Sequence, residues 1–120
     1  MKKVKIYQYT KCGTCRKALK YLEKNKLPYE MVPIVDQPPT KKELKSALDL
    51  LKGDLRKLFN TSGVVYREMK LSQKIKTMDP KKAIELLNSN GKLVKRPFVL
   101  TNKRLLVGFN EEEWNEALKS

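Results

Sequence analysis

The fold is decided by the stretch Val4-Lys5-Ile6-Tyr7-Gln8-Tyr9-Thr10-Lys11-Cys12-Gly13-Thr14-Cys15 near the start of the chain. Its apolar run over residues 4–9 predicts a β-strand, and from Cys15 onward apolar residues recur with helical spacing at Ala18, Leu19 and Leu22. A strand that turns into a helix through Cys-x-x-Cys places both sulfurs at the helix N-terminus. There, unpaired N–H groups and the helix dipole stabilise a thiolate. We therefore expect Cys12 to be the exposed nucleophile and Cys15 its resolving partner.

The Cys-x-x-Cys motif also occurs in zinc sites and by chance. A structural zinc site takes four Cys or His ligands, and this chain contains two cysteines and no histidine, so zinc would need carboxylates or a second chain. We expect no metal site. Two inert buried cysteines are a further alternative, and a structural disulfide would gain little because its loop is so short. Redox chemistry is favoured, as in thioredoxin-like proteins, and Lys11, Arg16 and Lys17 add positive charge beside the motif.

Composition limits the partners and the compartment. The 120 residues suffice for a single domain, 1–120, and carry 27 Lys and Arg against 13 Asp and Glu, a net charge of +14. This charge favours anionic partners, although a solvated lysine-rich surface explains it equally well. No aromatic-interleaved basic stripe accompanies it, so direct reading of nucleic acid is not expected. Without a signal peptide or an apolar run of membrane-spanning length, we expect no membrane association and a cytoplasmic protein with a reduced motif.

The first part of the chain predicts a strand, a helix and a second strand, over residues 4–9, 13–26 and 29–35. A path of this length implies parallel pairing of the two strands. The middle of the chain predicts helices. Thr40 and Glu43 fit a capping box that opens a helix ended by Gly53. Short helical pieces follow over residues 55–59, 66–69 and 71–75. Asp79-Pro80 opens another helix, which Asn90-Gly91 ends.

The last third returns to strands. Residues 98–100 and 104–107 predict a hairpin with its turn at Asn102-Lys103, and Asn110 caps a closing helix. The chain thus predicts an α/β, thioredoxin-like three-layer fold with a helical insertion between its βαβ and ββα halves. The core would comprise about residues 1–36 and 93–120, and the insertion residues 37–92.

Four segments resemble the arsenate reductase (ArsC)/Spx family, in the order in which that family has them. They are Cys12-Gly13-Thr14-Cys15-Arg16-Lys17-Ala18, Leu58-Phe59-Asn60-Thr61-Ser62-Gly63 with Tyr66-Arg67-Glu68, Val94-Lys95-Arg96-Pro97-Phe98-Val99, and Val107-Gly108-Phe109-Asn110-Glu111-Glu112. The family joins a thioredoxin fold to an inserted helical subdomain. One branch reduces arsenate with glutathione and glutaredoxin, a second (Spx) binds the C-terminal domain of the RNA polymerase α subunit, and a third contains thiol reductases.

The resemblance assigns roles to several residues. Cys12 matches the family's nucleophile, and Arg96 matches the arginine that holds an oxyanion beside the thiolate. Pro97 matches the proline that is usually cis and faces the active cysteine. With Lys11 and Arg16, these residues form the predicted substrate-binding or oxyanion-binding set, and Cys12 with Cys15 would form the redox disulfide. No bound cofactor is expected; glutathione with glutaredoxin, or thioredoxin, would donate electrons.

The sequence also departs from the arsenate reductases. Those enzymes carry a second arginine in the loop that reads Phe59-Asn60-Thr61 here and a third after the glycine that is Gly108 here. They also commonly lack the second cysteine of the motif. We therefore expect a thiol–disulfide oxidoreductase that acts on a disulfide, a glutathionylated substrate or an oxyanion. The alternative is a Spx-like redox-sensing regulator that binds the C-terminal domain of the RNA polymerase α subunit. Gly53 lies near the place where Spx has a glycine that meets RNA polymerase, but its role as a helix-ending residue is the simpler explanation.

Overall fold

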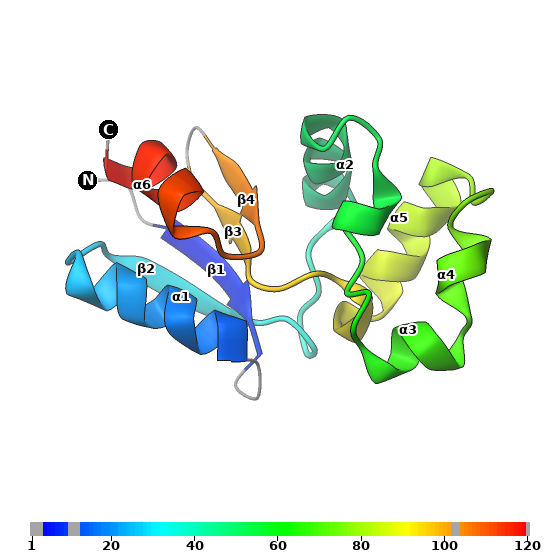
Figure 1. Ribbon diagram of the computed structural model, residues 1–120, viewed down its shortest axis with the longest axis horizontal. Helices are drawn as coiled ribbons and strands as arrows, with labels where there is room; N and C mark the ends of the chain where they lie inside the picture. The colour runs from blue at the N-terminus through cyan, green and yellow to red at the C-terminus, as the bar shows by residue number, and fades with distance from the viewer. Residues whose placement is uncertain (1–3, 10–12, 102–103, 120) are drawn as a thin grey trace. The chain divides into compact units, whose positions relative to one another are not determined.

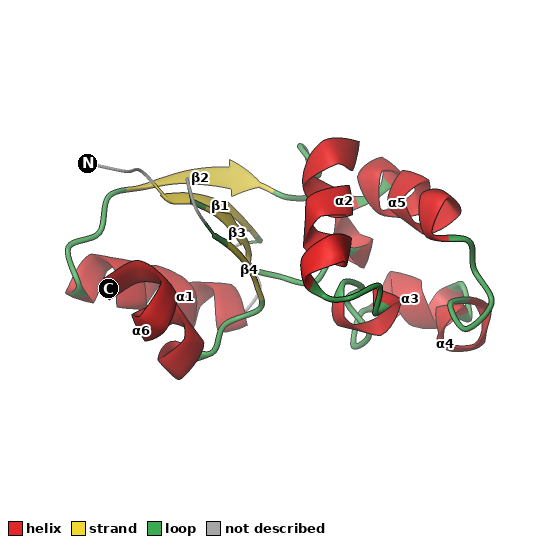
Figure 2. Ribbon diagram, turned by 90° about the horizontal axis from the view of Figure 1, so that it is seen from above, coloured by secondary structure: helices red, strands yellow, loops and turns green. Residues whose placement is uncertain are grey.

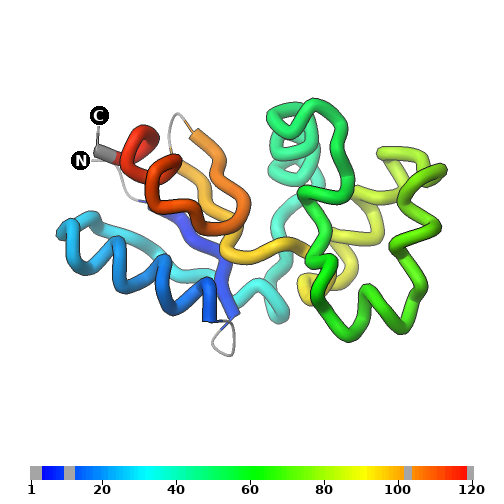
Figure 3. Tube along the Cα trace, viewed as in Figure 1, coloured from blue at the N-terminus to red at the C-terminus, as the bar shows by residue number. Residues whose placement is uncertain are grey.

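The computed structural model describes residues 4–9, 13–101 and 104–119. The chain divides into a sheet unit, formed by Met1–Val32 and Arg96–Ser120, and a helical unit, formed by Pro33–Lys95. Figure 3 shows how the two ends of the chain, blue and red, come together in the sheet unit. Each unit is described separately below, and the single-domain organisation expected from the sequence stays a prediction.

The sheet unit contains four strands and two helices. In chain order these are β1 (Val4–Gln8), α1 (Gly13–Lys24), β2 (Tyr29–Pro33), β3 (Phe98–Leu100), β4 (Leu105–Val107) and α6 (Glu111–Lys119). The strand order is β2-β1-β3-β4, and β3 pairs antiparallel with both β1 and β4. Because the sheet is mixed, β1 and β2 form its parallel pair, as the sequence predicts. The α/β thioredoxin-like fold with a helical insertion is confirmed (Figure 1).

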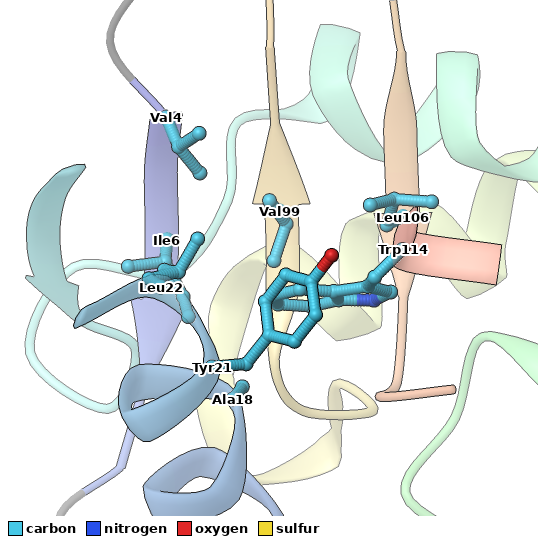
Figure 4. Packing of buried hydrophobic residues seen from close by; sticks show 8 residues of the cluster. All are labelled: Val4, Ile6, Ala18, Tyr21, Leu22, Val99, Leu106 and Trp114. Atoms are coloured by element: carbon cyan, nitrogen blue, oxygen red, sulfur yellow. The ribbon is translucent and has the colours of Figure 1, made fainter. Parts of the chain in front are cut away.

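One face of the sheet is covered by α1 and α6, which both views of the ribbon place on the same side (Figures 1 and 2). Side chains from three strands and both helices meet there in one cluster (Figure 4): Val4, Ile6, Ala18, Tyr21, Leu22, Val99, Leu106 and Trp114. Because side chains alternate along a strand, Tyr7 and Phe98 lie on the opposite face, where their rings meet edge-on at 5.8 Å. This cluster fixes α1, and with it Cys15 on the first turn of that helix.

Trp114 is the centre of this cluster. Its side chain is 1% exposed, and its ring makes T-shaped contacts with Phe109 at 4.9 Å and with Tyr21 at 5.6 Å. The indole Nε1–H donates to the carbonyl oxygen of Gly108 at 3.2 Å, so the polar atom of this buried ring is satisfied. Tyr21 in turn donates its hydroxyl to Asn115 Oδ1 at 2.6 Å.

The helical unit consists of short helices with well-formed caps. Its elements are α2 (Lys41–Leu50), η1 (Leu55–Lys57), α3 (Val64–Glu68), α4 (Leu71–Lys74), α5 (Pro80–Ser89) and η2 (Gly91–Leu93). The predicted capping box is present: Glu43 N–H donates to Thr40 Oγ1 at 3.1 Å, and Thr40 N–H donates to Glu43 Oε1 at 2.9 Å. Asp79 caps α5, with Pro80 as its first residue, as predicted. Local sequence therefore sets where these helices begin.

The ends of several elements differ from the sequence-based expectation. α1 ends at Lys24 instead of residue 26, β2 ends at Pro33 instead of residue 35, and α2 ends three residues before Gly53, which has φ 81°. Phe59, expected at the end of a helical piece, instead pairs with Val94 in an isolated antiparallel bridge. Long-range pairing overrides local propensity there.

Gly91 has a different role from the one expected. Among the described glycines, Gly53 and Gly108 have positive φ and Gly91 does not, so α5 does not end in the left-handed glycine cap that the sequence suggested. Instead, a Cβ at Gly91 would collide with the carbonyl oxygen of Ile34 and lie 2.7 Å from its carbonyl carbon. A glycine is needed here because two stretches of backbone approach closely.

Among the helices of the described residues, none is both long and apolar enough to cross a membrane.

Candidate functional site

The second cysteine of the Cys-x-x-Cys motif lies at the start of α1. Cys15 is on the first turn of α1, and its side chain is 0% exposed, on the side of the helix that carries Ala18 and Leu22 into the core. Gly13, Thr14 and Arg16 are exposed. Cys12 and Lys11, which directly precede α1, lie outside the described residues. The inner cysteine is therefore shielded from solvent within a helix whose first residue follows Cys12.

The segment that leads into β3 contributes Arg96 and Pro97. The Arg96–Pro97 peptide bond is cis, as the family resemblance implies, and Pro97 is buried. The carbonyl oxygen of Pro97 accepts a hydrogen bond from Gly108 N–H at 2.8 Å. Gly108 has φ 80°, in the left-handed region that favours glycine, so the turn after β4 requires a glycine at this position.

Arg96 stacks on the residue that follows β1. The antiparallel register pairs Lys5 with Leu100 and Tyr7 with Phe98. One further step of two residues on each chain brings Tyr9 opposite Arg96. The guanidinium carbon Cζ of Arg96 lies over the Tyr9 ring, 4.8 Å from its centroid, in a cation–π contact. The end of β1 and the start of β3 therefore hold this arginine against Tyr9, and Tyr9 lies three residues before Cys12 in the sequence.

One donor of Arg96 has no hydrogen-bond partner among the described residues. This donor is Nη1, which is buried. A buried charged donor without a partner is costly, and an anionic oxygen or thiolate would supply the missing acceptor. Arg96 is thus suited to holding an anion.

The structure brings together only part of the predicted set. Arg96 and Pro97 stand beside Tyr9 in the sheet unit, whereas Arg16 points from α1 into solvent. The sequence analysis missed Tyr9. An antiparallel register extended beyond the strand ends would have indicated it, since an aromatic residue there faces an arginine. Among the described residues, no group of three or more Cys, His, Asp or Glu side chains could hold a metal ion.

The two positions at which arsenate reductases carry further arginines have structural roles here. Asn60, in the helical unit, donates its backbone N–H to the carbonyl oxygen of Leu93 at 2.7 Å and its side-chain amide to that of Lys92 at 3.4 Å. Phe109, in the sheet unit, packs its ring against Trp114 and Tyr21. Neither residue carries the positive charge that an arginine would bring to an oxyanion.

Comparisons with known proteins agree with this architecture. Residues 7–117 match the ArsC family. The protein YusI of Bacillus subtilis is 44% identical over 92% of this chain and 94% of its own length. The global transcriptional regulator Spx 1 of Oceanobacillus iheyensis is 32% identical over 92% of this chain and 82% of its own.

Solved structures give the same result. A crystal structure of an ArsC-family-related protein from Bacteroides fragilis is 50% identical and superposes with a TM-score of 0.88, covering 94% of this chain and 95% of the other. A "possible arsenate reductase" from Streptococcus mutans is 31% identical with a TM-score of 0.85, covering 93% and 97%. The chain therefore belongs to the ArsC family and is related to both arsenate reductases and Spx.

Proposed function

We propose that this protein is a thiol–disulfide oxidoreductase that uses Cys12 and Cys15. The observation that carries the proposal is the buried Nη1 of Arg96, which has no acceptor among the described residues. The guanidinium group lies over the ring of Tyr9, and Tyr9 is three residues before Cys12 in the sequence. A thiolate, or the anionic group of a substrate bound beside it, would satisfy this donor.

The reaction would take two steps. The Cys12 thiolate attacks one sulfur of a substrate disulfide, so that a Cys12–substrate disulfide forms and the other substrate sulfur leaves as a thiolate. Cys15 then loses its proton and attacks the Cys12 sulfur, which releases the second substrate thiolate and leaves a Cys12–Cys15 disulfide. Two electrons pass to the substrate, and each released thiolate takes up a proton. A dithiol donor, thioredoxin or glutathione with glutaredoxin, reduces the protein again.

The burial of Cys15 supports this division of roles. A side chain with 0% exposure does not meet an external disulfide. Cys15 follows Cys12 by three residues in the sequence, so in this proposal it attacks a sulfur already bound to Cys12. Arg96 would hold the anionic group during the first step. Its planar fork can donate two parallel hydrogen bonds, which an ammonium cannot do.

A Cys12→Ser, Cys15→Ser and Arg96→Ala series tests the proposal. With a glutathionylated substrate, Cys12→Ser should have no turnover, and Cys15→Ser should accumulate a mixed disulfide visible by mass spectrometry. Arg96→Ala should lose a contact of about 1.5–3 kcal/mol, or roughly 10–150-fold in kcat/KM, and Arg96→Lys should recover part of it. Arg104→Ala, which removes the same charge from an exposed position, is the control. Full turnover by Cys12→Ser would refute the proposal.

A second candidate is a Spx-like regulator that binds the C-terminal domain of the RNA polymerase α subunit. The identity with Spx supports it, as does Gly53, which is exposed, has φ 81° and has open space around it. Binding of the purified domain to the oxidised and the reduced protein distinguishes the two functions. Tight binding that depends on oxidation, together with no turnover, would replace the reductase by the regulator.

A further inference from the structure

One exposed face of α1 carries a stripe of lysines that leads away from the redox motif. Lys17, Lys20 and Lys24 are all exposed and have the spacing i, i+3, i+7, which places them on one side of a helix. At 1.5 Å per residue they extend over about 10 Å. Gly13, which directly follows Cys12, lies one turn before Lys17 on the same side.

The stripe borders a hollow with an aromatic side. A surface depression of about 290 Å³ is lined by Lys17, Lys20, Tyr21, Lys24, Phe109 and Glu111. Phe109 is half-buried and cannot move freely, because its ring packs edge-on against Tyr21 at 5.8 Å and against Trp114 at 4.9 Å. Aromatic residues are enriched at the core of protein interfaces, and polar residues form the rim around them.

The charge of this hollow is strongly positive. Three ammonium groups line it against the single carboxylate of Glu111. Within the described part of the chain, no ion pair engages Lys17, Lys20 or Lys24. The stripe is therefore available to carboxylates from outside.

We propose that Lys17, Lys20 and Lys24, with Phe109, form the docking surface for an acidic protein thiol donor. This inference rests on the proposed function. The donor would present carboxylates to the lysines and an apolar group to Phe109, and its own cysteine would reach the Cys12–Cys15 disulfide at the start of α1. Its dithiol is oxidised to a disulfide while the two cysteines are reduced to thiols, so two electrons and two protons are transferred.

The helical unit offers a matched control for charge. α2 also carries exposed lysines, and Lys41 and Lys45 border a hollow of about 600 Å³. Lys20 and Lys24 have the same spacing of four residues as Lys41 and Lys45, so changing either pair to glutamine removes the same charge from one helix face. Gln and Lys have similar helix propensities. Only the first pair lies on the helix that begins at the redox motif.

The experiment measures reduction of the oxidised protein by three donors at about 10 mM and 150 mM salt. The donors are reduced thioredoxin of net negative charge, regenerated by its reductase and NADPH, then glutathione, and then uncharged dithiothreitol. With thioredoxin at low salt, Lys20→Gln/Lys24→Gln should lower kcat/KM about five- to tenfold, and the loss should shrink at the higher salt. The control Lys41→Gln/Lys45→Gln should change it less than twofold. Dithiothreitol should reduce all three proteins at equal rates.

Each other outcome has a definite meaning. Equal losses in the two double variants would show that overall charge steers the donor, which overturns a local docking surface. A loss with glutathione alone would make the occupant a small anionic thiol, which also overturns it. Turnover that is indifferent to Lys20 and Lys24 contradicts only the docking surface, whereas a wild-type protein that no donor keeps turning over contradicts the proposed function itself.

Discussion

The sheet unit and the helical unit are stabilised in different ways. The sheet unit depends on contacts between residues far apart in the sequence, such as Ile6 with Val99 across two strands and Tyr21 with Trp114 across two helices. The helical unit is built of short helices with local caps, and its long-range contacts include the Phe59–Val94 bridge and the close backbone approach at Gly91. Both cysteines and Arg96 belong to the first unit. The chemistry-bearing residues are thus held by non-local packing. Each stability prediction below changes one unit, and the first of them also compares the two.

The largest effect is expected for Trp114→Ala. Removal of a side chain that is 1% exposed should destabilise the sheet unit by about 3–5 kcal/mol, because the cavity cannot collapse against a rigid sheet. Urea denaturation followed by circular dichroism measures the loss, and Trp114→Phe is the milder variant if Trp114→Ala does not fold. Hydrogen exchange read by mass spectrometry then compares the two units. Equal loss of protection in both would show that they unfold as one.

Gly91→Ala should destabilise the helical unit by about 1–3 kcal/mol. The new methyl group would meet the backbone of Ile34, which cannot rotate away as a side chain can. The matched control is Gly13→Ala, since no described residue outside its chain neighbours and its own helix backbone lies within 4 Å of a Cβ at Gly13. If Gly91→Ala were as stable as Gly13→Ala, the close approach would not constrain this unit.

Thr40→Ala should cost about 1 kcal/mol, because it removes the acceptor for Glu43 N–H at the start of α2. Glu43→Ala should cost less, and the double variant should lose less than the sum, since both side chains belong to one capping box. Thr77→Ala, at an exposed position, is the control. Thermal denaturation of the four proteins measures the coupling, and additive losses would contradict reciprocal capping.

The smallest expected effect is on the stability of the sheet unit at alkaline pH. Burial, followed by the charge of Glu111, raises the pKa of Tyr21 above its ordinary value of 10.0. The folded state therefore favours the neutral phenol, so this stabilisation is complete below pH 10.0 and is lost as the pH rises through the raised pKa. Tyr21→Phe should lose its hydrogen bond at neutral pH but show a flatter fall in Tm between about pH 9 and 11 than the wild type. Parallel curves would contradict this assignment.

Local signals in the sequence predicted the beginnings of elements better than their ends. Thr40 with Glu43, and Asp79 with Pro80, form caps that depend on neighbouring residues, and both are present. Phe59 was expected in a helical piece but pairs with Val94, and Gly91 was expected as a helix cap but avoids a collision with Ile34. Both differences come from contacts over more than thirty residues, which local spacing does not encode.

In the candidate site, too, features set by local sequence were predicted and features set by long-range contacts were not. The motif and Arg96 were recognised from short segments, and Cys15 lies at the start of the predicted helix. The stacking of Arg96 on Tyr9 depends on the register between β1 and β3, and the hollow beside Phe109 depends on the packing of α6 near α1. The helical spacing of Lys17, Lys20 and Lys24 was readable from the sequence, but the aromatic ring beside them was not.

The hydrogen bonds of Gly108 connect the indole of Trp114 to the segment that carries Arg96, so the indole NMR signal can report on anion binding. Gly108 accepts from the Trp114 indole through its carbonyl oxygen and donates from its N–H to the carbonyl oxygen of Pro97, the residue after Arg96. Trp114 is the only tryptophan, so its indole proton gives one isolated NMR signal. An anion that binds Arg96 and shifts this turn would move that signal, without any label at the site. Occupancy could thus be titrated from inside the hydrophobic core, in a protein with both cysteines replaced.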